Sequence, residues 1–169
     1  GFMSIQYWRM QLHPDHSTFS SFYAHTSIAK GFIGLDFKQE SNAGDLLTLQ
    51  DDDKLGYQKS YLPFARDMKI GDIVLIVSHH NPIAIVKITS DYNYIRQVIP
   101  ELGIWFRHFR QIDKDNIIYY SDFETNKNNY QSITMTNTIS PLKNDDSQSM
   151  QLIQEMIKWE KSHNPDSVY

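Results

Sequence analysis

The side chains that could do chemistry in this 169-residue chain include seven histidines and no cysteine. His13 and His16 flank a Pro-containing turn, whereas His79 and His80 are adjacent, so a strand would point them to opposite faces. A zinc site needs three or four converging ligands, and no H-E-x-x-H motif is present. We therefore predict no metal and no cofactor, with these histidines at the surface or at the edge of the core.

Sequence motifs of the common catalytic sites are also absent. The chain contains neither G-x-x-x-x-G-K-[ST] nor G-x-G-x-x-G, which bind nucleotide phosphates, and it has no G-x-S-x-G nucleophile turn. The lack of cysteine excludes disulfides and thiolate nucleophiles. A glycosidase-type pair of carboxylates can be judged only from geometry. We therefore predict that this chain is not an enzyme.

Aromatic residues interleaved with cations form the remaining pattern, most densely in "IWFRHFR", residues 104–110. Nucleic-acid bases stack on aromatic faces, and Arg and Lys bind phosphates. The candidate aromatics are Trp8, Tyr92, Tyr94, Trp105 and Phe106, and the candidate phosphate contacts are Arg9, Lys87, Arg96, Arg107 and Arg110. The alternative is that the aromatics fill the core while the arginines extend their charged ends to solvent.

Charge and hydropathy limit the partners. The net charge is −4, from 16 basic and 20 acidic residues, so the chain lacks the general basic surface of many nucleic-acid-binding domains. A local basic patch is still compatible with this total, because net charge averages over faces. No apolar run reaches the roughly 18 residues that span a bilayer, and no signal peptide opens the chain. We predict a cytoplasmic protein without a membrane partner.

The strands that would carry these residues are predicted from β-branched runs and turn residues. A β-hairpin is predicted over 68–92, where "DIVLIV" and "IAIVKI" are joined by "SHHNP", whose Asn and Pro favour a turn. "GIWFRHFRQI" and "NIIYYSDF" predict a second hairpin that turns at 113–116. Further strands are predicted over 4–12 and 31–37 and within "QSITMTNTISPL".

Three helices are predicted between and after these strands. The first begins at Ser17 or Thr18 and ends at Lys30 with Gly31 as its C-cap; we expect one face to carry Phe19, Phe22, Tyr23 and Thr26. The second, over about 54–67 and shortened by Pro63, follows a polar loop over 38–56. The third is the amphipathic "DDSQSMQLIQEMIKWEKS" near the C-terminus.

This order of elements predicts an α+β fold, with a small curved β-barrel or sheet flanked by helices. We expect a single domain over 4–163. Gly1 and Phe2, ahead of the start residue Met3, are expected to be an expression scar, and 164–169 the start of a linker or a frayed end.

The motif order adds a family resemblance over roughly residues 4–125. "YWRMQL", a helix ending in "SIAKGFIGLDF", and "ARDMKIGDIVLIVSHHNPIAIVKITSDY" resemble the PUA-like superfamily, in particular its EVE and YTH branches. Among these domains the chain looks most like the N-terminal DNA-reading module of McrB-type modification-dependent restriction GTPases. In contrast to the methyl-RNA readers of the superfamily, "GFIGLD" carries no Trp on the strand after the first helix.

The resemblance implies a non-catalytic module that recognises a methylated base, flipped out of duplex DNA into an aromatic pocket. Asp36 would accept a hydrogen bond from an exocyclic amine of the base, unless it is a structural acceptor for a nearby loop. The implied base-pocket residues are Trp8, Gln11, Ile33, Gly34, Asp36, Tyr92, Tyr94 and Trp105.

The resemblance also implies partners. These are duplex DNA that carries a modified base and a nuclease recruited through the remainder of a longer protein. Two other functions stay open on the sequence alone, namely an RNA-binding PUA-like module and a domain that binds a protein or a small ligand.

Overall fold

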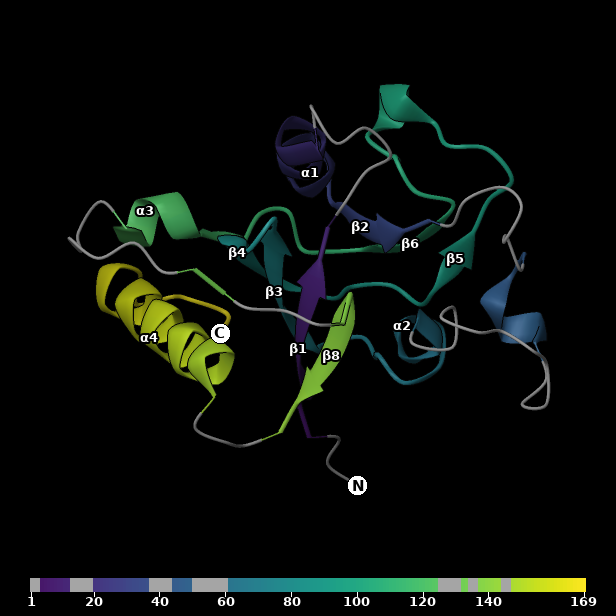
Figure 1. Cartoon of the computed structure of the whole chain (residues 1–169). Coiled ribbons are helices and arrows are strands. Elements are labelled where there is room, and N and C mark those ends of the chain that lie inside the picture. The colour runs from purple at the N-terminus through teal and green to yellow at the C-terminus, as the bar shows by residue number, and fades with distance from the viewer. Residues whose placement is uncertain are drawn as a thin grey trace.

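Two open β-sheets and their covering helices make up the computed structural model, which describes residues 4–12, 20–36, 44–49, 61–124, 132–133, 137–143 and 147–169 (Figure 1). The larger sheet has the order β7 (Ile118–Tyr119), β4 (Asn81–Lys87), β3 (Ile73–Ser78), β1 (Tyr7–Gln11) and β8 (Ile139–Leu142). Its strands are antiparallel except for the central pair, in which β1 lies parallel to β3 with Trp8 opposite Val74.

The smaller sheet is antiparallel and has the order β2 (Phe32–Leu35), β6 (His108–Gln111) and β5 (Asn93–Tyr94). A single β-bridge between Ile88 and Ile112 links the end of β4 to the end of β6. The described strands form two sheets and no closed barrel. The predicted α+β class is confirmed, with open sheets in place of a barrel.

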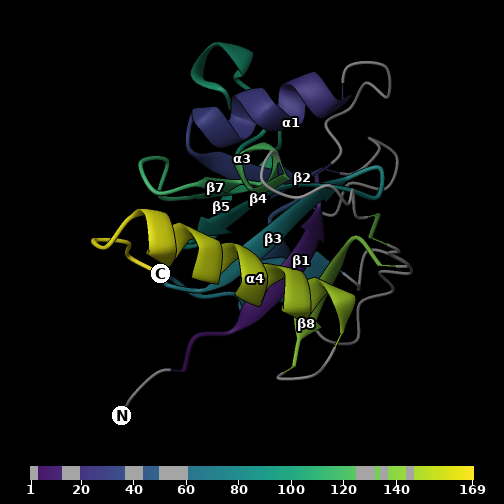
Figure 2. The same cartoon turned by 90° about the vertical axis from the view of Figure 1, so that its left-hand side faces the viewer.

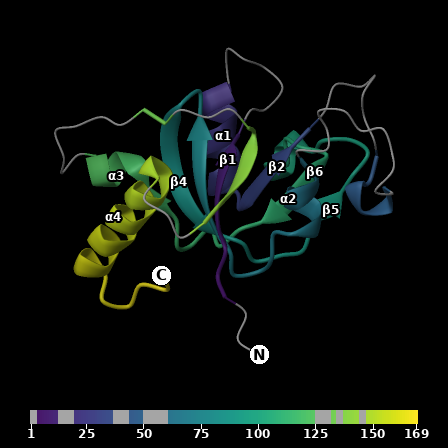
Figure 3. The same ribbon diagram turned by 60° about the horizontal axis from the view of Figure 1, so that its bottom comes forward.

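Helices cover the larger sheet on both faces. On one face lie α3 (Tyr120–Glu124) and α4 (Gln148–His163), and α4 crosses the strands in Figure 2. On the other lie α1 (Ser20–Ala29), α2 (Leu62–Arg66) and the smaller sheet, which stands beside the larger one in Figure 3. Two 3-10 turns, η3 (Leu46–Thr48) and η5 (Pro100–Leu102), complete the described elements.

Burial on both faces explains the composition of β3. All six of its residues are buried, with Val74 and Ile76 in one apolar cluster and Ile73, Leu75 and Val77 in the other. A strand covered on both sides reads as a continuous apolar run, without the alternation of a half-exposed strand. The predicted hairpin of β3 and β4 is confirmed, and it supplies the centre of the core.

The turns of the two predicted hairpins differ from expectation. His79 and His80 form the first turn with φ of 49° and 68°, because β4 already begins at Asn81; the turn does not use the Asn-Pro pair. The second hairpin is wrong. Residues 108–111 pair with β2 and β5, whereas 118–119 pair with β4 in the other sheet, so the chain changes sheets after Ile112.

The positions of the helices agree with the prediction better than the faces that they bury. α1 ends before Gly31, whose φ is +92°, as a C-cap requires. Its buried residues are Ala24, Ser27 and Ile28, while Phe22 is 66% exposed, so the predicted apolar face is wrong. The expected cap at 17–18 and residues 54–60 of the second predicted helix lie outside the described residues; α2 begins at Leu62, with Pro63 in its first turn.

The C-terminal segment also forms as predicted up to residue 163. Ser147 caps α4 by accepting a hydrogen bond from the Met150 N–H. Beyond the helix, Tyr169 donates from its hydroxyl to the carbonyl oxygens of Ile85 and Asn116, so 164–169 return to β4. The domain boundaries themselves stay a prediction.

Candidate nucleic-acid interface

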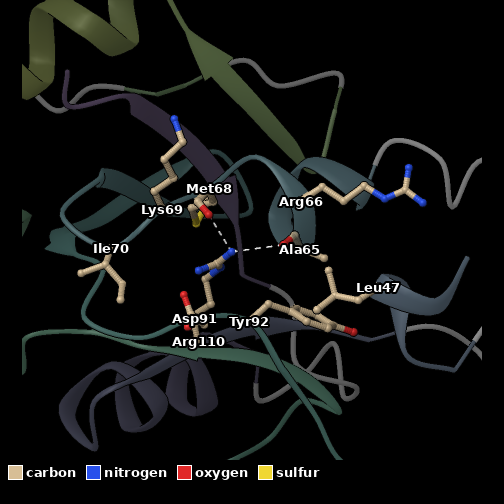
Figure 4. Close-up of a pocket in the computed structure, with 9 residues that line it drawn as sticks. All are labelled: Leu47, Ala65, Arg66, Met68, Lys69, Ile70, Asp91, Tyr92 and Arg110. Atoms are coloured by element: carbon tan, nitrogen blue, oxygen red, sulfur yellow. Dashed lines mark hydrogen bonds between the residues drawn. The ribbon is translucent and has the colours of Figure 1, made fainter. Parts of the chain in front are cut away.

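A hollow of about 630 Å³ lies where α2, η3 and the segments before β3 and β5 meet (Figure 4). We call it the cationic pocket. This volume falls within the range of about 300–1,000 Å³ that is typical of ligand sites. It is lined by Leu47, Ala65, Arg66, Met68, Lys69, Ile70, Asp91, Tyr92 and Arg110.

Arg110 forms the floor of the cationic pocket and is 2% exposed. Its guanidinium donates to the carbonyl oxygens of Phe64, Ala65, Met68 and Ser90, at 2.9, 3.4, 2.7 and 2.9 Å. These bonds join β6 to α2 and to the loop before β5. Burial lowers the pKa of Arg110, yet a guanidinium stays charged in proteins, so the floor keeps its positive charge.

The walls of the cationic pocket are apolar and exposed. Leu47 is 56% exposed and Ile70 is 55% exposed, and Figure 4 shows them at opposite ends of the pocket. The ring of Tyr92 lies beside Leu47, next to the buried Arg110. A flat, partly apolar ligand would therefore meet aliphatic side chains at two ends and an aromatic residue at the base.

The rim of the cationic pocket carries most of its accessible charge. Arg66 and Lys69 are exposed, and Arg66 donates to the Leu49 carbonyl oxygen at 2.7 Å, which ties α2 to the segment after η3. With Arg110, these make three cations against one carboxylate, that of Asp91. Among the described lining residues, positive side chains therefore outnumber negative ones, although the whole chain has a net charge of −4.

The hydroxyl of Tyr92 is held in place by two polar contacts. Its hydroxyl accepts from the Leu46 N–H at 3.0 Å and lies 2.7 Å from Nδ1 of His108. His108 is fully buried, and the Tyr94 ring packs on it with centroids 5.0 Å apart. Burial lowers the pKa of His108 to about 4 and raises that of the Tyr92 hydroxyl, so both are neutral near pH 7.

Asp36 does not line the cationic pocket. Its carboxylate accepts from Nε of Arg107 at 2.6 Å and forms an ion pair with the same guanidinium, while its other oxygen faces the Arg107 N–H at 3.4 Å. The pair joins the end of β2 to the residue before β6. This contact is what a structural acceptor would make, and the place of Asp36 in a base pocket stays a prediction.

Trp8 is 2% exposed and lies in the core, where it supports the rim of the cationic pocket indirectly. Its indole N–H donates to Asp72 at 3.0 Å, and Asp72 also accepts from the backbone N–H groups of Gln6 and Lys69. The buried carboxylate thus fixes the turn that presents Lys69. The same contact connects β1 to the start of β3.

Four other predicted base-pocket residues do not line the cationic pocket but pack within the fold. Ile33 is fully buried, and Gly34 lies so close to β6 that a Cβ there would overlap the His108 carbonyl oxygen and approach Cβ of Phe106 to 2.7 Å. Trp105 is half-buried and stacks on Tyr23 with centroids 4.2 Å apart. Gln11 ends β1 and is half-buried.

The predicted phosphate contacts are spread over the molecule. Arg9 donates to Ser149 and Ser140 towards α4, on the far face of the sheet from the cationic pocket. Lys87 donates to the Val168 carbonyl oxygen, and Arg96 is exposed in the loop after β5. Of the predicted site residues, the structure brings Tyr92 and Arg110 to the cationic pocket. That the predicted cations contact phosphates stays a prediction.

Seven lining residues of the cationic pocket were missed by the sequence analysis: Leu47, Ala65, Arg66, Met68, Lys69, Ile70 and Asp91. Exposed aliphatics in short turns leave no periodic signal. The clearest available signal was "ARDMKIGD", where two cations stand three residues apart directly before the most apolar strand. Asp91 could have been singled out as the carboxylate next to Tyr92.

The described part of the chain holds neither a cluster of metal ligands nor a helix that could span a membrane. No group of three or more His, Asp or Glu side chains there could hold a metal ion. Within the same residues, none of the helices combines the length and the apolar character needed to cross a membrane.

Comparison with known families gives a match over most of the chain. Residues 8–143 match the model of a family described as "Domain of unknown function (DUF8426)". The chain belongs to this family. A search of curated proteins found no match.

Two solved structures are faintly similar to this DUF8426 member. One is the YTH domain of the MRB1 protein of Zygosaccharomyces rouxii in complex with N6-methyladenosine RNA, with 9% identity and a TM-score of 0.42, covering 94% of this chain and 92% of that chain. The other is protein Atu2648 of Agrobacterium tumefaciens, with 15% identity and a TM-score of 0.36, covering 96% of this chain and 97% of that chain. At these scores the likeness says nothing about a ligand of this chain.

Proposed function

We propose that the chain is a non-catalytic nucleic-acid-binding module that receives one modified base in the cationic pocket. The observation that carries the proposal is the local charge of this hollow. A protein with net charge −4 places Arg66, Lys69 and Arg110 around a space of about 630 Å³ with an aromatic residue at its base. Cations around an aromatic surface suit a base and its phosphate.

The walls suggest how the base would be held. Leu47 and Ile70 would contact its edges, and Tyr92 would pack beside it. Asp91, the carboxylate among the described lining residues, would accept a hydrogen bond from an exocyclic amine, which adenine and cytosine carry and thymine lacks. A base methyl group buried against these aliphatics would contribute about 1 kcal/mol, or roughly a fivefold preference.

Duplex DNA is the proposed substrate, and the base must then leave the stack to reach the cationic pocket. Arg66 and Lys69 would contact the phosphates beside the extruded nucleotide, because both are exposed at the rim. We propose further that the module directs a McrB-type restriction complex to modified DNA. The modest affinity of one pocket would be raised by the multiplicity of such an assembly.

Binding titrations test the proposal on matched ligands. The chain is titrated with duplexes that carry no modification, one N6-methyladenine or one 5-methylcytosine, and with single-stranded RNA of the same sequence. We expect one modified duplex to bind several-fold more tightly than the others, with an affinity that falls as salt rises. Equal affinity for all duplexes would refute modified-base reading, and preference for RNA would replace DNA as the substrate.

Two variants locate the site in the same assay. Asp91→Asn keeps the size of the side chain but changes its hydrogen-bonding groups, so we expect the discrimination among bases to fall. Asp67→Asn is the matched control, because Asp67 is exposed at the end of α2 and does not line the cationic pocket. An unchanged preference in Asp91→Asn would exclude Asp91 from base recognition.

A further inference from the structure

A second, smaller hollow of about 180 Å³ adjoins the cationic pocket. It is lined by Ser4, Ile5, Lys69, Ile70, Gly71, Asp72 and Lys87. Lys69 and Ile70 line both hollows, so these two residues form a ridge between them. A ligand that leaves the cationic pocket across this ridge enters the second hollow directly.

The second hollow has a positive side and an apolar side. Lys69 and Lys87 supply two ammonium groups, while Ile5 and Ile70 are 48% and 55% exposed. The Lys87 ammonium donates to the Val168 carbonyl oxygen at 2.7 Å and lies 5.2 Å from the centre of the Tyr169 ring. Both partners are uncharged, so they position the ammonium group without neutralising it.

Asp72 is the acidic residue of this lining, and its carboxylate is buried and hydrogen-bonded within the protein. It is 2% exposed, and its two oxygens accept hydrogen bonds from the Gln6 N–H at 3.1 Å, the Trp8 indole at 3.0 Å and the Lys69 N–H at 2.9 Å. These donors offset the carboxylate charge where it lies. The exposed Lys69 and the half-buried Lys87 therefore supply the charge that an approaching anion meets.

We infer that the second hollow is the subsite for the phosphate and sugar of the nucleotide that neighbours the base in the cationic pocket. This inference rests on the proposed function and extends it, because the binding surface then takes a strand of at least two nucleotides. The strand crosses the ridge, with its phosphate between Lys69 and Lys87 and its sugar against Ile5 and Ile70. The ligand class is a polynucleotide backbone, and a single nucleotide would fill only half of the surface.

Ligand length gives the first test. The chain is titrated with the modified mononucleotide and with the two dinucleotides that extend it on the 5′ or the 3′ side. We expect one dinucleotide to bind several-fold more tightly than the mononucleotide, and this gain to disappear in Lys87→Gln. Equal affinity for the mononucleotide and both dinucleotides, or a gain that survives in Lys87→Gln, would overturn the subsite.

Salt dependence gives the second test, on a duplex with the modified base. One lost phosphate contact lowers the slope of log K against log salt by about 0.7–0.9. We expect this decrease in Lys87→Gln and its rescue in Lys87→Arg. Lys161→Gln is the matched control, because Lys161 is exposed on α4 and lines neither hollow.

A third variant separates the charge of Lys87 from its contact with the C-terminal segment. Tyr169→Ala removes the ring beside the ammonium group and leaves the charge in place, so we expect its salt slope to match the unmodified protein. A slope as low in Tyr169→Ala as in Lys87→Gln would assign the effect to the C-terminal segment and overturn the subsite. If modified-base selectivity persists while Lys87→Gln changes neither readout, the subsite fails and the proposed function stands. If no nucleic acid binds, both fail.

Discussion

The hydroxyl of Tyr92 lies 2.7 Å from Nδ1 of His108, and through this contact the aromatic residue at the base of the cationic pocket is fixed to the smaller sheet. The same hydroxyl accepts from the Leu46 N–H at 3.0 Å, and Leu46 begins η3, which presents Leu47 to the pocket. One oxygen atom therefore joins β6, the start of β5 and η3. The shape of the cationic pocket depends on it.

Replacing Tyr92 by Phe removes this oxygen and leaves the ring. The buried N–H of Leu46 and Nδ1 of His108 would each lose a partner, which we expect to cost about 1–3 kcal/mol of unfolding free energy. We also expect weaker ligand binding, because η3 loses its attachment. Chemical denaturation and binding titration measure the two effects. Tyr119→Phe is the control, since Tyr119 lies in β7 and does not line the pocket; a loss of equal size there would contradict this role of Tyr92.

The pH dependence of stability tests the burial of His108. Its pKa is lowered to about 4, below the value of about 6.5 for an exposed histidine. The unfolded chain therefore binds this proton at higher pH than the folded chain does. We expect the contribution of His108 to be fully present above about pH 6.5 and to be lost as pH falls from 6.5 to 4, with a slope of up to about 1.4 kcal/mol per pH unit.

The measurement compares unfolding free energies of the protein and of His108→Asn between pH 4 and 7, so that the titration of other groups cancels. We expect a flatter profile in the variant, whatever its absolute stability. His79→Asn provides the control, because His79 is exposed in a turn with φ of 49°, a conformation that Asn adopts readily. Identical slopes in the protein and in His108→Asn would refute the predicted pKa.

Because Asp36 is paired with Arg107, we predict that replacing Asp36 lowers the stability of the protein but not its preference for the modified base. The two side chains are 26% and 14% exposed, so Asp36→Asn would remove the carboxylate charge that faces a partly buried guanidinium. We expect a loss of about 1–3 kcal/mol in unfolding free energy and an unchanged preference for the modified base. A stable Asp36→Asn protein without base preference would return Asp36 to the base pocket.

The close approach of β2 and β6 predicts a strong effect of a single methyl group. A Cβ at Gly34 would overlap the backbone of β6, so we expect Gly34→Ala to cost at least about 2–3 kcal/mol. Gly44→Ala is the matched control: its φ of +74° costs about 1 kcal/mol in alanine, and its Cβ would meet open space. Thermal denaturation compares them, and equal losses would contradict the packing of β2 on β6.

Helices and strands can be predicted where their burial or their caps leave a pattern of residue types in the sequence. The run from Ile73 to Val77 is continuous because both of its faces are covered, and α4 shows its cap at Ser147. The false hairpin shows the limit of such patterns. Residues 108–111 and 118–119 each read as a strand, but their partners are chosen by contacts in two different sheets.

The candidate site was less accessible to sequence reasoning, because its contacts join distant segments. Asp36 and Arg107 are separated by 71 positions, and only the antiparallel pairing of β2 with β6 brings them together. Trp8 and Arg110 are conspicuous residue types for nucleic-acid binding. Their hydrogen bonds to Asp72 and to backbone carbonyls show that the same chemistry also stabilises a core.

The most direct test of the central claim is a methyl NMR titration of the full chain with a short duplex that carries one modified base. Filling the cationic pocket would shift the methyl signals of Leu47, Met68 and Ile70 in a saturable manner. The methyl signals of Ile133, Leu152 and Ile153, in the core on the α4 face of the larger sheet, should stay in place. Saturable shifts confined to other surfaces, with Leu47 and Ile70 unchanged, would contradict the assignment of this pocket to the base.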